Sequence, residues 1–294
     1  MEADVLIIGC GPAGLQAAIH SSRKKAKTVL VGKPNNSSAH GTDIENYFGV
    51  VDDGDTLISE GLGQAKSFGT EFLEQNVISA GKDGDVFVFG TDDGTQIRSK
   101  AVVIATGISR KKLNVPGEKE LLGKGVSYCA VCDCNFYKGR RVVIVGNESE
   151  AAVSAKLMTS YASETSWVAW DLTANEAVVS RALDAGVRLY NSKPKSIDGS
   201  GKVESLTLND GTVISVDGVF IELGAKSAAD IAMDLDLMPE LDDTIKVDQE
   251  CRTEVPGVFA CGDITGKPWQ VAKAVGQGCV AGLNAADYAK GDKK

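Results

Sequence analysis

A repeated pattern constrains the fold of this chain more than any other feature. Residues 93–107 contain an Asp-Gly turn followed by an apolar run that ends in glycine, and residues 210–224 repeat this arrangement at an offset of 117 residues. In each copy the turn predicts a β-hairpin, and the apolar run predicts a strand buried on both faces. Each copy also has a strand that runs into a glycine turn, at residues 4–14 and 141–151. The sequence therefore predicts an α/β protein with two Rossmann-like units, each a βαβ unit with a β-hairpin insert.

The second predicted unit interrupts the first, and 294 residues are enough for two domains. After residue 224, an apolar strand at 258–261 ends in Gly262-Asp263, and a helix is predicted from about Gln270 to Tyr288. These elements complete the first unit. We therefore expect one domain from residues 1–114 and 246–294 and an inserted domain from residues 115–245. The expected hinges are residues 114–117 and 244–247.

The first glycine turn predicts a nucleotide site. Gly9, Gly11 and Gly14 form a G-x-G-x-x-G pattern, with Pro12 and Ala13 between the last two glycines. The pattern follows a predicted strand and opens a predicted helix, which is the context that dinucleotide binding requires. Glycines let the backbone approach a pyrophosphate, which then lies at the positive end of the helix dipole. The alternative is a tight turn that serves only the packing of the helix on the strand.

The strand after this helix lacks the acidic residue that often binds the ribose of a dinucleotide. It ends in Gly32-Lys33 instead. We therefore expect the ribose to be held by the backbone or by Lys33.

Two further segments favour FAD over NAD as the ligand. Ala105-Thr106-Gly107 ends the strand of the first hairpin, and Asp263 could place its carboxylate on the ribityl hydroxyl groups. In order and spacing these segments, together with Glu45-Asn46 and residues 125–133, resemble the low-molecular-weight thioredoxin reductase family of flavoproteins. The resemblance covers nearly the whole chain. It implies an FAD-binding first domain, a redox-active second domain and a homodimer, with FAD contacts from Asn46, Gly107, Asp263, Gln270 and Val271.

Residues 129–134 contain the most specific element of the resemblance. Cys129 and Cys132 have the Cys-x-x-Cys spacing, which allows a readily reversed disulfide, and a helix N-terminus there would lower the pKa of a thiol. The resemblance implies that Cys132 faces the flavin and that Cys129 attacks the substrate disulfide. It also implies that Asp133 protonates the departing thiolate. The implied substrate is a thioredoxin-like protein.

Other roles for these cysteines are weaker. Zinc needs four ligands, but the sequence has no second Cys-x-x-Cys pair, and both histidines lie far away in sequence. An iron–sulfur cluster would need a fourth nearby cysteine. An inert pair of thiols is the remaining alternative. Cys134 departs from the family, where a small residue is usual. It is either a small apolar replacement or a thiol that resolves a mixed disulfide or forms an alternative bridge. The other four cysteines are scattered and predict small buried hydrophobic residues.

The second glycine turn, residues 146–151, lacks two of the expected glycines. Glu148 stands at the position of the second glycine, and Glu150 adds another negative charge, so both oppose a pyrophosphate. The next strand ends in Asp171 without a pair of arginines for a 2′-phosphate. We therefore expect that NADPH is not an efficient electron donor. The combination resembles the NADPH-independent branch of the family, whose members take electrons from ferredoxin, from reduced deazaflavin or through a second flavin.

The electron donor suggests two further features. Trp167 and Trp170 either stack an extra ring or pack in the core. Because ferredoxin is acidic, its docking site should be locally basic, and the candidates are residues 23–27, 110–112 and 138–141. Each of these basic segments has the alternative of being a solvated helix end or turn.

Charge and hydropathy exclude several classes of partner. The net charge of −9 disfavours nucleic acid and anionic membrane surfaces, and no stretch is apolar enough for a membrane span. The apolar run at residues 5–8 is short and follows acidic residues, so we expect no signal peptide and a cytoplasmic location. The favoured function is a flavin-dependent thiol–disulfide oxidoreductase. The alternatives are a flavin oxidase that uses the dithiol as a relay and a non-enzymatic FAD-binding redox sensor.

Overall fold

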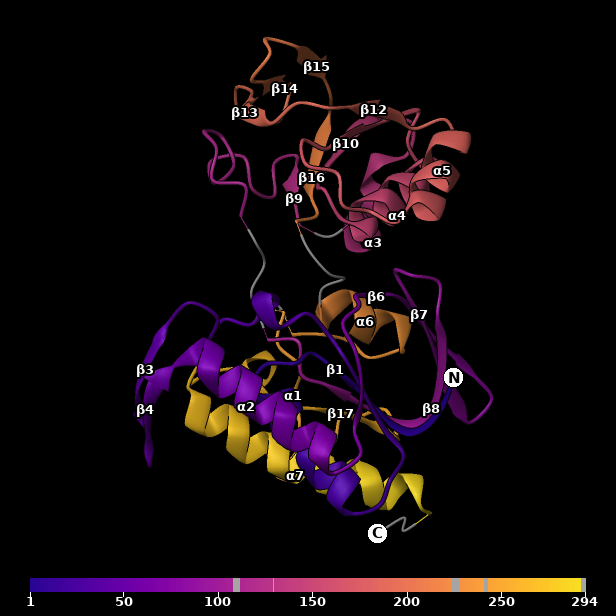
Figure 1. The fold of residues 1–294 in the computed structure, drawn as a ribbon. Helices are drawn as coiled ribbons and strands as arrows, with labels where there is room; N and C mark the ends of the chain where they lie inside the picture. Colours follow the sequence, from indigo (N-terminus) through magenta and orange to yellow (C-terminus); the bar gives the residue numbers. More distant parts are fainter. Residues whose placement is uncertain (108–111, 129, 224–227, 241–242, 292–294) are drawn as a thin grey trace. The chain divides into compact units, whose positions relative to one another are not determined.

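The computed structural model describes residues 1–107, 112–128, 130–223, 228–240 and 243–291, and only the backbone of Val51 and Cys132. Contacts divide the chain into two compact units (Figure 1). The first unit contains Met1–Ser109 and Lys226–Lys294, and the second contains Arg110–Ala225. No helix in the described parts of the chain is long and apolar enough to cross a membrane.

The first unit is built around a seven-stranded sheet with the strand order β5-β2-β1-β8-β7-β6, in which β17 also pairs with β8. Strands β5, β2, β1, β8 and β17 are parallel, and β6 and β7 form the hairpin insert. Its elements are β1 (Glu2–Ile8), α1 (Pro12–Arg23), β2 (Thr28–Val31), η1 (Pro34–Asn36), β3 (Asp43–Tyr47), β4 (Val50–Asp53), α2 (Gly54–Ser67), β5 (Glu71–Leu73), β6 (Val77–Asp83), β7 (Val86–Thr91), β8 (Gln96–Ile104), α6 (Ala228–Asp234), β17 (Val258–Ala260), η3 (Gly262–Thr265) and α7 (Val271–Ala289).

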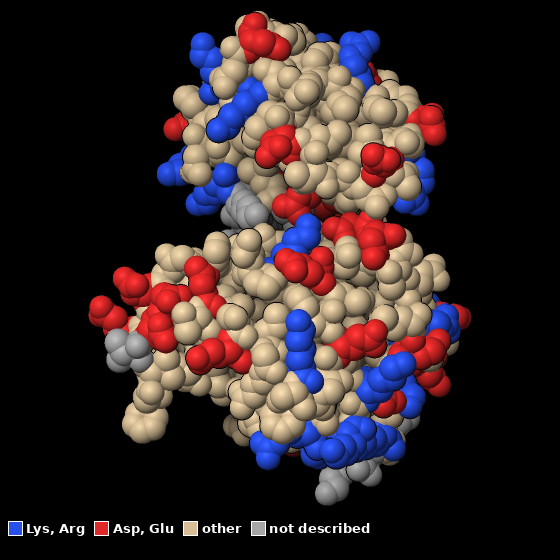
Figure 2. Space-filling view, viewed as in Figure 1, with Lys and Arg blue, Asp and Glu red and all other residues tan. Residues whose placement is uncertain are grey.

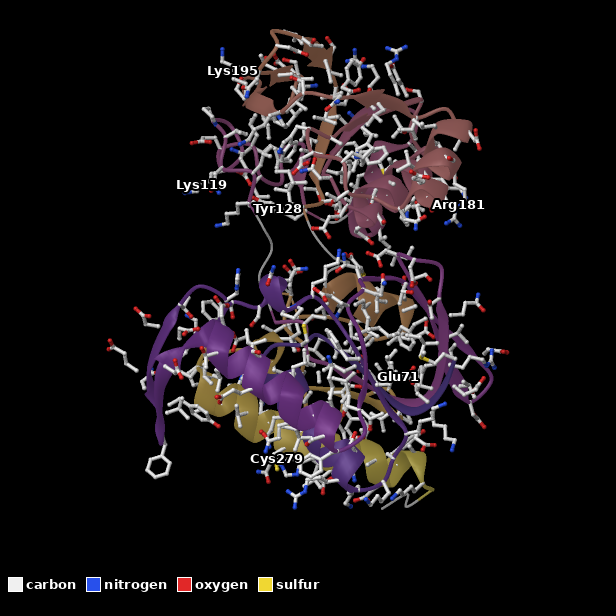
Figure 3. The ribbon with its side chains drawn as sticks, viewed as in Figure 1. Glu71, Lys119, Tyr128, Arg181, Lys195 and Cys279 are labelled. Carbon is white, nitrogen blue, oxygen red and sulfur yellow. The ribbon has the colours of Figure 1, made fainter. Side chains whose placement is uncertain are left out.

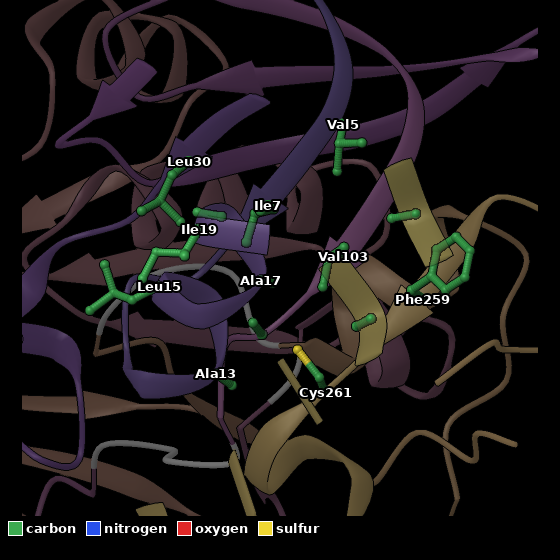
Figure 4. Packing of buried hydrophobic residues seen from close by; sticks show 14 of the residues in the cluster. Val5, Ile7, Ala13, Leu15, Ala17, Ile19, Leu30, Val103, Phe259 and Cys261 are labelled. Atoms are coloured by element: carbon green, nitrogen blue, oxygen red, sulfur yellow. The ribbon is translucent and has the colours of Figure 1, made fainter. Parts of the chain in front are cut away.

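Both faces of the parallel sheet are covered, because its strands are apolar on both sides. Val5 and Ile7 of β1 pack with α1, α2 and α7 on one face (Figure 4). The alternate residues Leu6 and Ile8 pack on the other face, with the β6–β7 hairpin and α6. This alternation follows from the two-residue period of a strand. The first unit therefore has three layers, with the parallel sheet in the middle.

Helices α1 and α7 approach each other closely because small residues line their contact. A Cβ atom at Gly278 would lie 2.2 Å from the carbonyl oxygen of Ala13, and one at Gly282 would lie 2.3 Å from that of Ala17. Real side chains do not tolerate such distances, so only glycine allows this approach. The contact fixes α1, and with it the glycine turn that precedes α1.

Replacing Gly282 with alanine should therefore lower the free energy of unfolding of the first unit. We expect a loss of about 1–3 kcal/mol, the usual cost of overpacking, measured by urea denaturation. Gly276→Ala in the same helix is the matched control, because a Cβ there meets nothing within 4 Å. The control should be neutral or stabilising by up to about 1 kcal/mol. Equal effects of the two substitutions would contradict this account of the packing.

The second unit repeats the plan of the first. Its five-stranded parallel sheet has the order β12-β11-β10-β16-β9, and a separate three-stranded sheet has the order β13-β14-β15. Its elements are β9 (Val126–Ser127), α3 (Ala130–Asp133), η2 (Cys134–Tyr137), β10 (Arg141–Val145), α4 (Ser149–Met158), β11 (Glu164–Val168), α5 (Glu176–Asp184), β12 (Arg188–Tyr190), β13 (Pro194–Asp198), β14 (Ser205–Leu208), β15 (Val213–Ser215) and β16 (Gly218–Ile221).

The repeat seen in the sequence corresponds to this repeated topology. β1, β2, β5, β8 and β17 of the first unit hold the places that β10, β11, β12, β16 and β9 hold in the second. Both predicted Asp-Gly turns are present and have the same local bond. The N–H of Thr95 donates to the Asp93 side chain at 2.9 Å, and the N–H of Thr212 donates to the Asp210 side chain at 2.9 Å.

The boundaries between the units differ from those expected at residues 114 and 246. Residues 228–245 belong to the first unit, because Ile231, Leu237 and Ile245 are buried in its second core layer. Residues 112–117 belong to the second unit, where Leu113 is part of the core. The expected hinges at 114–117 and 244–247 are therefore held inside the units. Pro116 and Gly117 indicated a turn in the first of these segments, and turns also occur within compact domains.

Candidate functional site

The carboxyl ends of the parallel strands bring the predicted cofactor residues of the first unit together. Residues Ile8, Ile104 and Ala260 end β1, β8 and β17 in matching register. Two hydrogen bonds continue this register beyond the strands. The N–H of Ala105 donates to the carbonyl of Ile8 at 2.8 Å, and the N–H of Cys261 donates to the carbonyl of Ile104 at 3.0 Å. The predicted residues that follow these strands therefore lie at one edge of the sheet: Gly9, Ala105, Thr106, Gly107, Gly262 and Asp263.

The first glycine turn requires glycine at two of its positions. Gly9 has a φ of 106°, and a Cβ there would lie 2.4 Å from the carbonyl oxygen of Ala105. A Cβ at Gly14 would lie 1.8 Å from the carbonyl oxygen of Gly9. Gly11 is the N-cap residue of α1, and Pro12 follows as its first residue. The turn is therefore as tight as the pattern predicts, and it ends at a helix N-terminus whose first N–H groups have no partner within the helix.

Two predicted contact residues that are 224 positions apart in the sequence meet directly. The side-chain amide of Asn46, on β3, donates to the side-chain oxygen of Gln270 at 2.8 Å. Gln270 is the N-cap residue of α7, and Val271 is the first residue of that helix. The structure thus brings Asn46, Gln270 and Val271 together at the beginning of α7.

The region expected to bind ribose contains Lys33 and Cys10. The Lys33 ammonium lies 3.6 Å from the Asp92 carboxylate, so it forms an ion pair there. A Cβ at Gly32 would lie 2.9 Å from the backbone nitrogen of Cys10, which explains glycine at the end of this strand. Burial raises the pKa of the Cys10 thiol to about 12. Cys10 is therefore a neutral thiol at neutral pH.

Two of the other scattered cysteines, Cys251 and Cys261, are also protonated thiols. Cys251 and Cys261 are buried, and burial raises the pKa of Cys251 to about 11 and raises that of Cys261 as well. Cys279 is half-buried. The prediction of small buried hydrophobic residues is confirmed for Cys10, Cys251 and Cys261.

The predicted redox segment belongs to the second unit. Cys129 lies outside the described residues, and Cys132 lies in α3. The backbone N–H of Ala130, between the two cysteines in sequence, donates to the carboxylate of Glu222 at 3.0 Å. Glu222 is buried and follows β16, and α3 contacts α4. The segment is therefore attached to the carboxyl end of the second parallel sheet.

A buried carboxylate supports the residue that precedes Cys129. Glu118 is only 2% exposed, and one of its oxygens accepts hydrogen bonds from the Tyr128 hydroxyl (2.6 Å) and the N–H of Leu113 (3.0 Å). Its other oxygen accepts one from the N–H of Asn114 at 2.5 Å. Tyr128 is labelled in Figure 3. Glu118 thus joins the first described residues of the second unit to the strand end that leads into the redox segment.

Cys134 is buried in this unit, and its thiol donates to the carbonyl of Val131 at 3.3 Å. A hydrogen bond with Cys134 raises the pKa of the Tyr161 hydroxyl. This burial and this hydrogen bond favour the interpretation of Cys134 as a small apolar residue over its interpretation as a resolving thiol. The half-buried Asp133 ends α3.

The second glycine turn differs from the first in its backbone and its contacts. Gly146 does not have the positive φ of Gly9. The side-chain oxygen of Asn147 accepts hydrogen bonds from the N–H groups of Trp170 (3.0 Å) and Asp171 (3.3 Å). The carbonyl of Asn147 accepts another from the N–H of Thr173 at 2.9 Å. The segment that follows β11 is therefore bonded directly to the turn.

Acidic and polar side chains occupy the beginning of α4. Glu148 is its half-buried N-cap residue, and Glu150 is buried in its first turn. The Ser149 hydroxyl oxygen accepts a hydrogen bond from the N–H of Asn175 at 3.0 Å. Negative side chains at a helix N-terminus interact favourably with the helix dipole. Glu148 and Glu150 therefore provide the negative charge that a bound anion would otherwise provide at this end of α4. Trp167 is fully buried and donates to the carbonyl of Gly146 at 2.8 Å, so for Trp167 core packing is confirmed.

The basic segments considered for docking have partners of their own or fall partly outside the described residues. Figure 2 shows lysine and arginine side chains gathered near the C-terminal ends of α1 and α7. There Lys24 forms an ion pair with Asp287. Arg141 pairs with Asp217 at 3.4 Å. Arg110 and Lys111 lie outside the described residues.

Four residues that contribute to these arrangements were not predicted from the sequence. Lys273 and Gln277 of α7 bond to the turn that carries Asp263, and Glu118 and Glu222 support the redox segment. The spacing of Lys273 and Gln277 could have indicated a common role, because residues four apart share one face of a helix. An acid after the apolar strand β16 was the signal for Glu222. Such a residue is seldom buried without a specific partner.

Two Rossmann-like units, one of which has a tight glycine turn at a helix N-terminus, indicate a dinucleotide-binding protein. Residues 3–278 match the family model described as pyridine nucleotide-disulphide oxidoreductase. The thioredoxin reductase of Listeria innocua serovar 6a is 36% identical over 299 residues, which cover 97% of this chain and 93% of that protein. The chain therefore belongs to the pyridine nucleotide-disulphide oxidoreductase family.

Solved structures share the whole fold. The atypical thioredoxin reductase TRi from Desulfovibrio vulgaris Hildenborough is 33% identical, with a TM-score of 0.82 over 99% of both chains. A ferredoxin-flavin thioredoxin reductase from Clostridium acetobutylicum is 31% identical, with a TM-score of 0.66 over 100% of this chain and 99% of that chain. The predicted fold class and the resemblance to thioredoxin reductases are confirmed.

Proposed function

We propose that this protein is a flavin-dependent thiol–disulfide oxidoreductase that reduces a thioredoxin-like protein through Cys129 and Cys132 and takes electrons from a donor other than NADPH. Its membership of the thioredoxin reductase group makes it an oxidoreductase with FAD as cofactor. The difference between the two glycine turns is the observation that carries the choice of donor.

The residues of the first unit fit FAD. A Cβ at Gly9 or Gly14 would collide with the backbone, so neither position can carry a side chain. The turn therefore presents its backbone directly to a pyrophosphate. We infer that Gly9, Gly11, Pro12, Ala13 and Gly14 hold the pyrophosphate. The remaining contacts come from the same sheet edge and the beginning of α7: Asn46, Ala105, Thr106, Gly107, Gly262, Asp263, Gln270 and Val271. When bound, FAD supplies the electron pair that reduces the disulfide of the second unit.

The cysteines of the second unit carry the exchange. The Cys129 thiolate attacks one sulfur of the substrate disulfide and forms a mixed disulfide, and the other substrate sulfur leaves as a thiolate that Asp133 protonates. The Cys132 thiolate then attacks the sulfur of Cys129. This step releases the reduced substrate and closes the Cys129–Cys132 disulfide. The bond from Ala130 to Glu222 supports this assignment, because it anchors the segment between the two cysteines.

The second unit is unsuited to NADPH. A pyrophosphate at the second turn would meet Glu148 and Glu150 and would have to displace the segment bonded to Asn147. The repulsion between like charges and the segment already bonded to this turn both oppose the binding of a pyrophosphate. The Clostridium acetobutylicum relative is a ferredoxin-flavin thioredoxin reductase, so a ferredoxin is a suitable donor to test first. Reduced deazaflavin is the second candidate donor.

Anaerobic bleaching of the bound flavin tests the choice of donor. We expect reduced ferredoxin or reduced deazaflavin to bleach the flavin, and micromolar NADPH or NADH to do so at least about tenfold more slowly, the effect of losing one charge-assisted hydrogen bond. Dithionite titration should show uptake of about four electrons per FAD, two for the flavin and two for the disulfide. Rapid bleaching by micromolar NADPH would refute the proposed donor. The homodimer and the cytoplasmic location stay predictions.

A further inference from the structure

Lys273 holds the turn that carries Asp263. It lies in the first turn of α7, and its ammonium donates to the carbonyl of Gly262 (2.9 Å), the Thr265 hydroxyl (3.0 Å) and the carbonyl of Gly266 (2.5 Å). These three acceptors surround Asp263 in sequence. All three are uncharged, so the bonds orient the ammonium without neutralising it.

Gln277, one helical turn later, completes this arrangement. Its side-chain oxygen accepts hydrogen bonds from the N–H of Gly262 (3.0 Å) and from the Thr265 hydroxyl (2.8 Å). The turn is also pressed against α1, because a Cβ at Gly262 would lie 2.7 Å from the Cβ of Ala13. The position of Asp263 is therefore set by α7 on one side and by α1 on the other.

Burial and charge act in opposite directions on Asp263. Burial raises the pKa of its carboxyl group above the usual value, and the positive charge of Lys273 offsets part of this rise. Burial lowers the pKa of the Lys273 ammonium below its usual value, and the Asp263 carboxylate offsets part of this effect. The thiols of Cys251 and Cys261 would act in the same direction as Asp263 only when ionised. Beyond these groups, Asp248 acts on Cys251. Lys273 is thus the cation that favours the ionised form of Asp263.

We propose that Lys273 is a positioning residue that keeps Asp263 oriented and ionised for the ribityl hydroxyl groups of the cofactor. This inference rests on the proposed FAD site. An ionised carboxylate accepts hydrogen bonds at both oxygens, whereas a protonated one loses part of that capacity. Without Lys273, Asp263 would take up a proton at a higher pH and would bind hydroxyl groups less well.

Binding of FAD and of ADP to the full-length apoprotein tests this role. ADP shares the adenosine and phosphate groups of FAD but lacks the ribityl chain. For Lys273→Met, we expect the Kd for FAD to rise by about tenfold to a hundredfold, the range expected for one charge-assisted hydrogen bond. The Kd for ADP should stay within about twofold of wild type. Both are measured by isothermal titration calorimetry between pH 6 and pH 8.

The pH dependence gives a readout that a purely structural role would not change. Because FAD binding requires the ionised carboxylate and the substitution raises the pKa of Asp263, the variant's Kd for FAD should rise as the pH falls, over a range where the wild-type value stays constant. Lys273→Arg should restore the wild-type profile. Lys273→Gln keeps a hydrogen-bond donor but should behave like Lys273→Met.

Three outcomes would overturn the inference. They are an unchanged FAD affinity in Lys273→Met, an equal loss of ADP and FAD affinity, and a loss of FAD affinity that does not vary with pH. ADP binding also serves as the folding control for each variant. If the wild-type apoprotein binds ADP but not FAD, the proposed FAD function itself fails. That result differs from all three outcomes, which concern only the variants.

Discussion

Replacing Cys132 with serine is expected to abolish turnover of a thioredoxin-like disulfide, lowering kcat by at least about a thousandfold. Cys129 would still attack the substrate, but no second thiol would release it. The variant should therefore accumulate a covalent mixed disulfide between Cys129 and one substrate cysteine. Intact-protein mass spectrometry under non-reducing conditions should show this adduct, and a reducing agent should remove it. Cys129→Ser should be inactive and form no adduct.

Cys134→Ser is the matched control for this experiment. Cys134 lies two residues further along, is buried and bonds to the carbonyl of Val131, so its loss should leave turnover within about threefold of wild type. Steady turnover by Cys132→Ser would contradict the assignment of the redox pair. An adduct that is absent from Cys132→Ser but present in the double variant Cys132→Ser/Cys134→Ser would instead revive the resolving role of Cys134, because that thiol would then release the substrate and form a Cys129–Cys134 disulfide.

Replacing Gly14 with alanine should yield a protein that is purified without its yellow cofactor. The new Cβ would lie 1.8 Å from the carbonyl oxygen of Gly9, and neither backbone can yield without opening the turn. Overpacking of this kind costs about 1–3 kcal/mol, and the lost backbone approach adds to it. We expect the Kd for FAD to rise by about a hundredfold or more, where each tenfold corresponds to about 1.4 kcal/mol. Flavin absorbance per protein and titration of the apoprotein measure the change.

Gly63→Ala is the control for the loss of a helical glycine. Gly63 lies exposed in α2, and a Cβ there meets nothing within 4 Å. This variant should keep the wild-type FAD content and gain up to about 1 kcal/mol of stability, as an exposed helix does when alanine replaces glycine. A Gly14→Ala protein that keeps its FAD content would show that the turn is not the cofactor cradle.

The sequence predicted the features of this fold that depend on local patterns. The repeated Asp-Gly hairpins, the strand before Gly9 and the helix beginning near Gln270 each have a signature of turn chemistry or hydrophobic period, and each is present. The predicted parallel topology also implied that the strand ends meet at one edge of the sheet. Only the family resemblance gave Asn46 and Gln270 a common role, as contacts of FAD, because 224 residues separate them in sequence.

Features that depend on tertiary contacts were missed or misplaced. Residues 228–234, which form α6, were expected in the inserted domain but pack in the core of the first unit. Their sequence shows an apolar face but not which sheet that face covers. The support of Asp263 by Lys273 and Gln277 depends on how α7 crosses the η3 turn. The three bonds to Glu118 join residues that are close in sequence, yet only burial distinguishes this carboxylate from its exposed neighbour Glu120.

The bonds of Asn147 limit what glycine substitutions at the second turn would achieve. A chain with glycine at positions 148 and 151 would still have Trp170, Asp171 and Thr173 bonded to the Asn147 turn, because those contacts use only Asn147. Nucleotide binding at this turn would require a new path for the segment after β11 as well as the glycines. We therefore expect that glycine substitutions alone would not create a nucleotide site in the second unit.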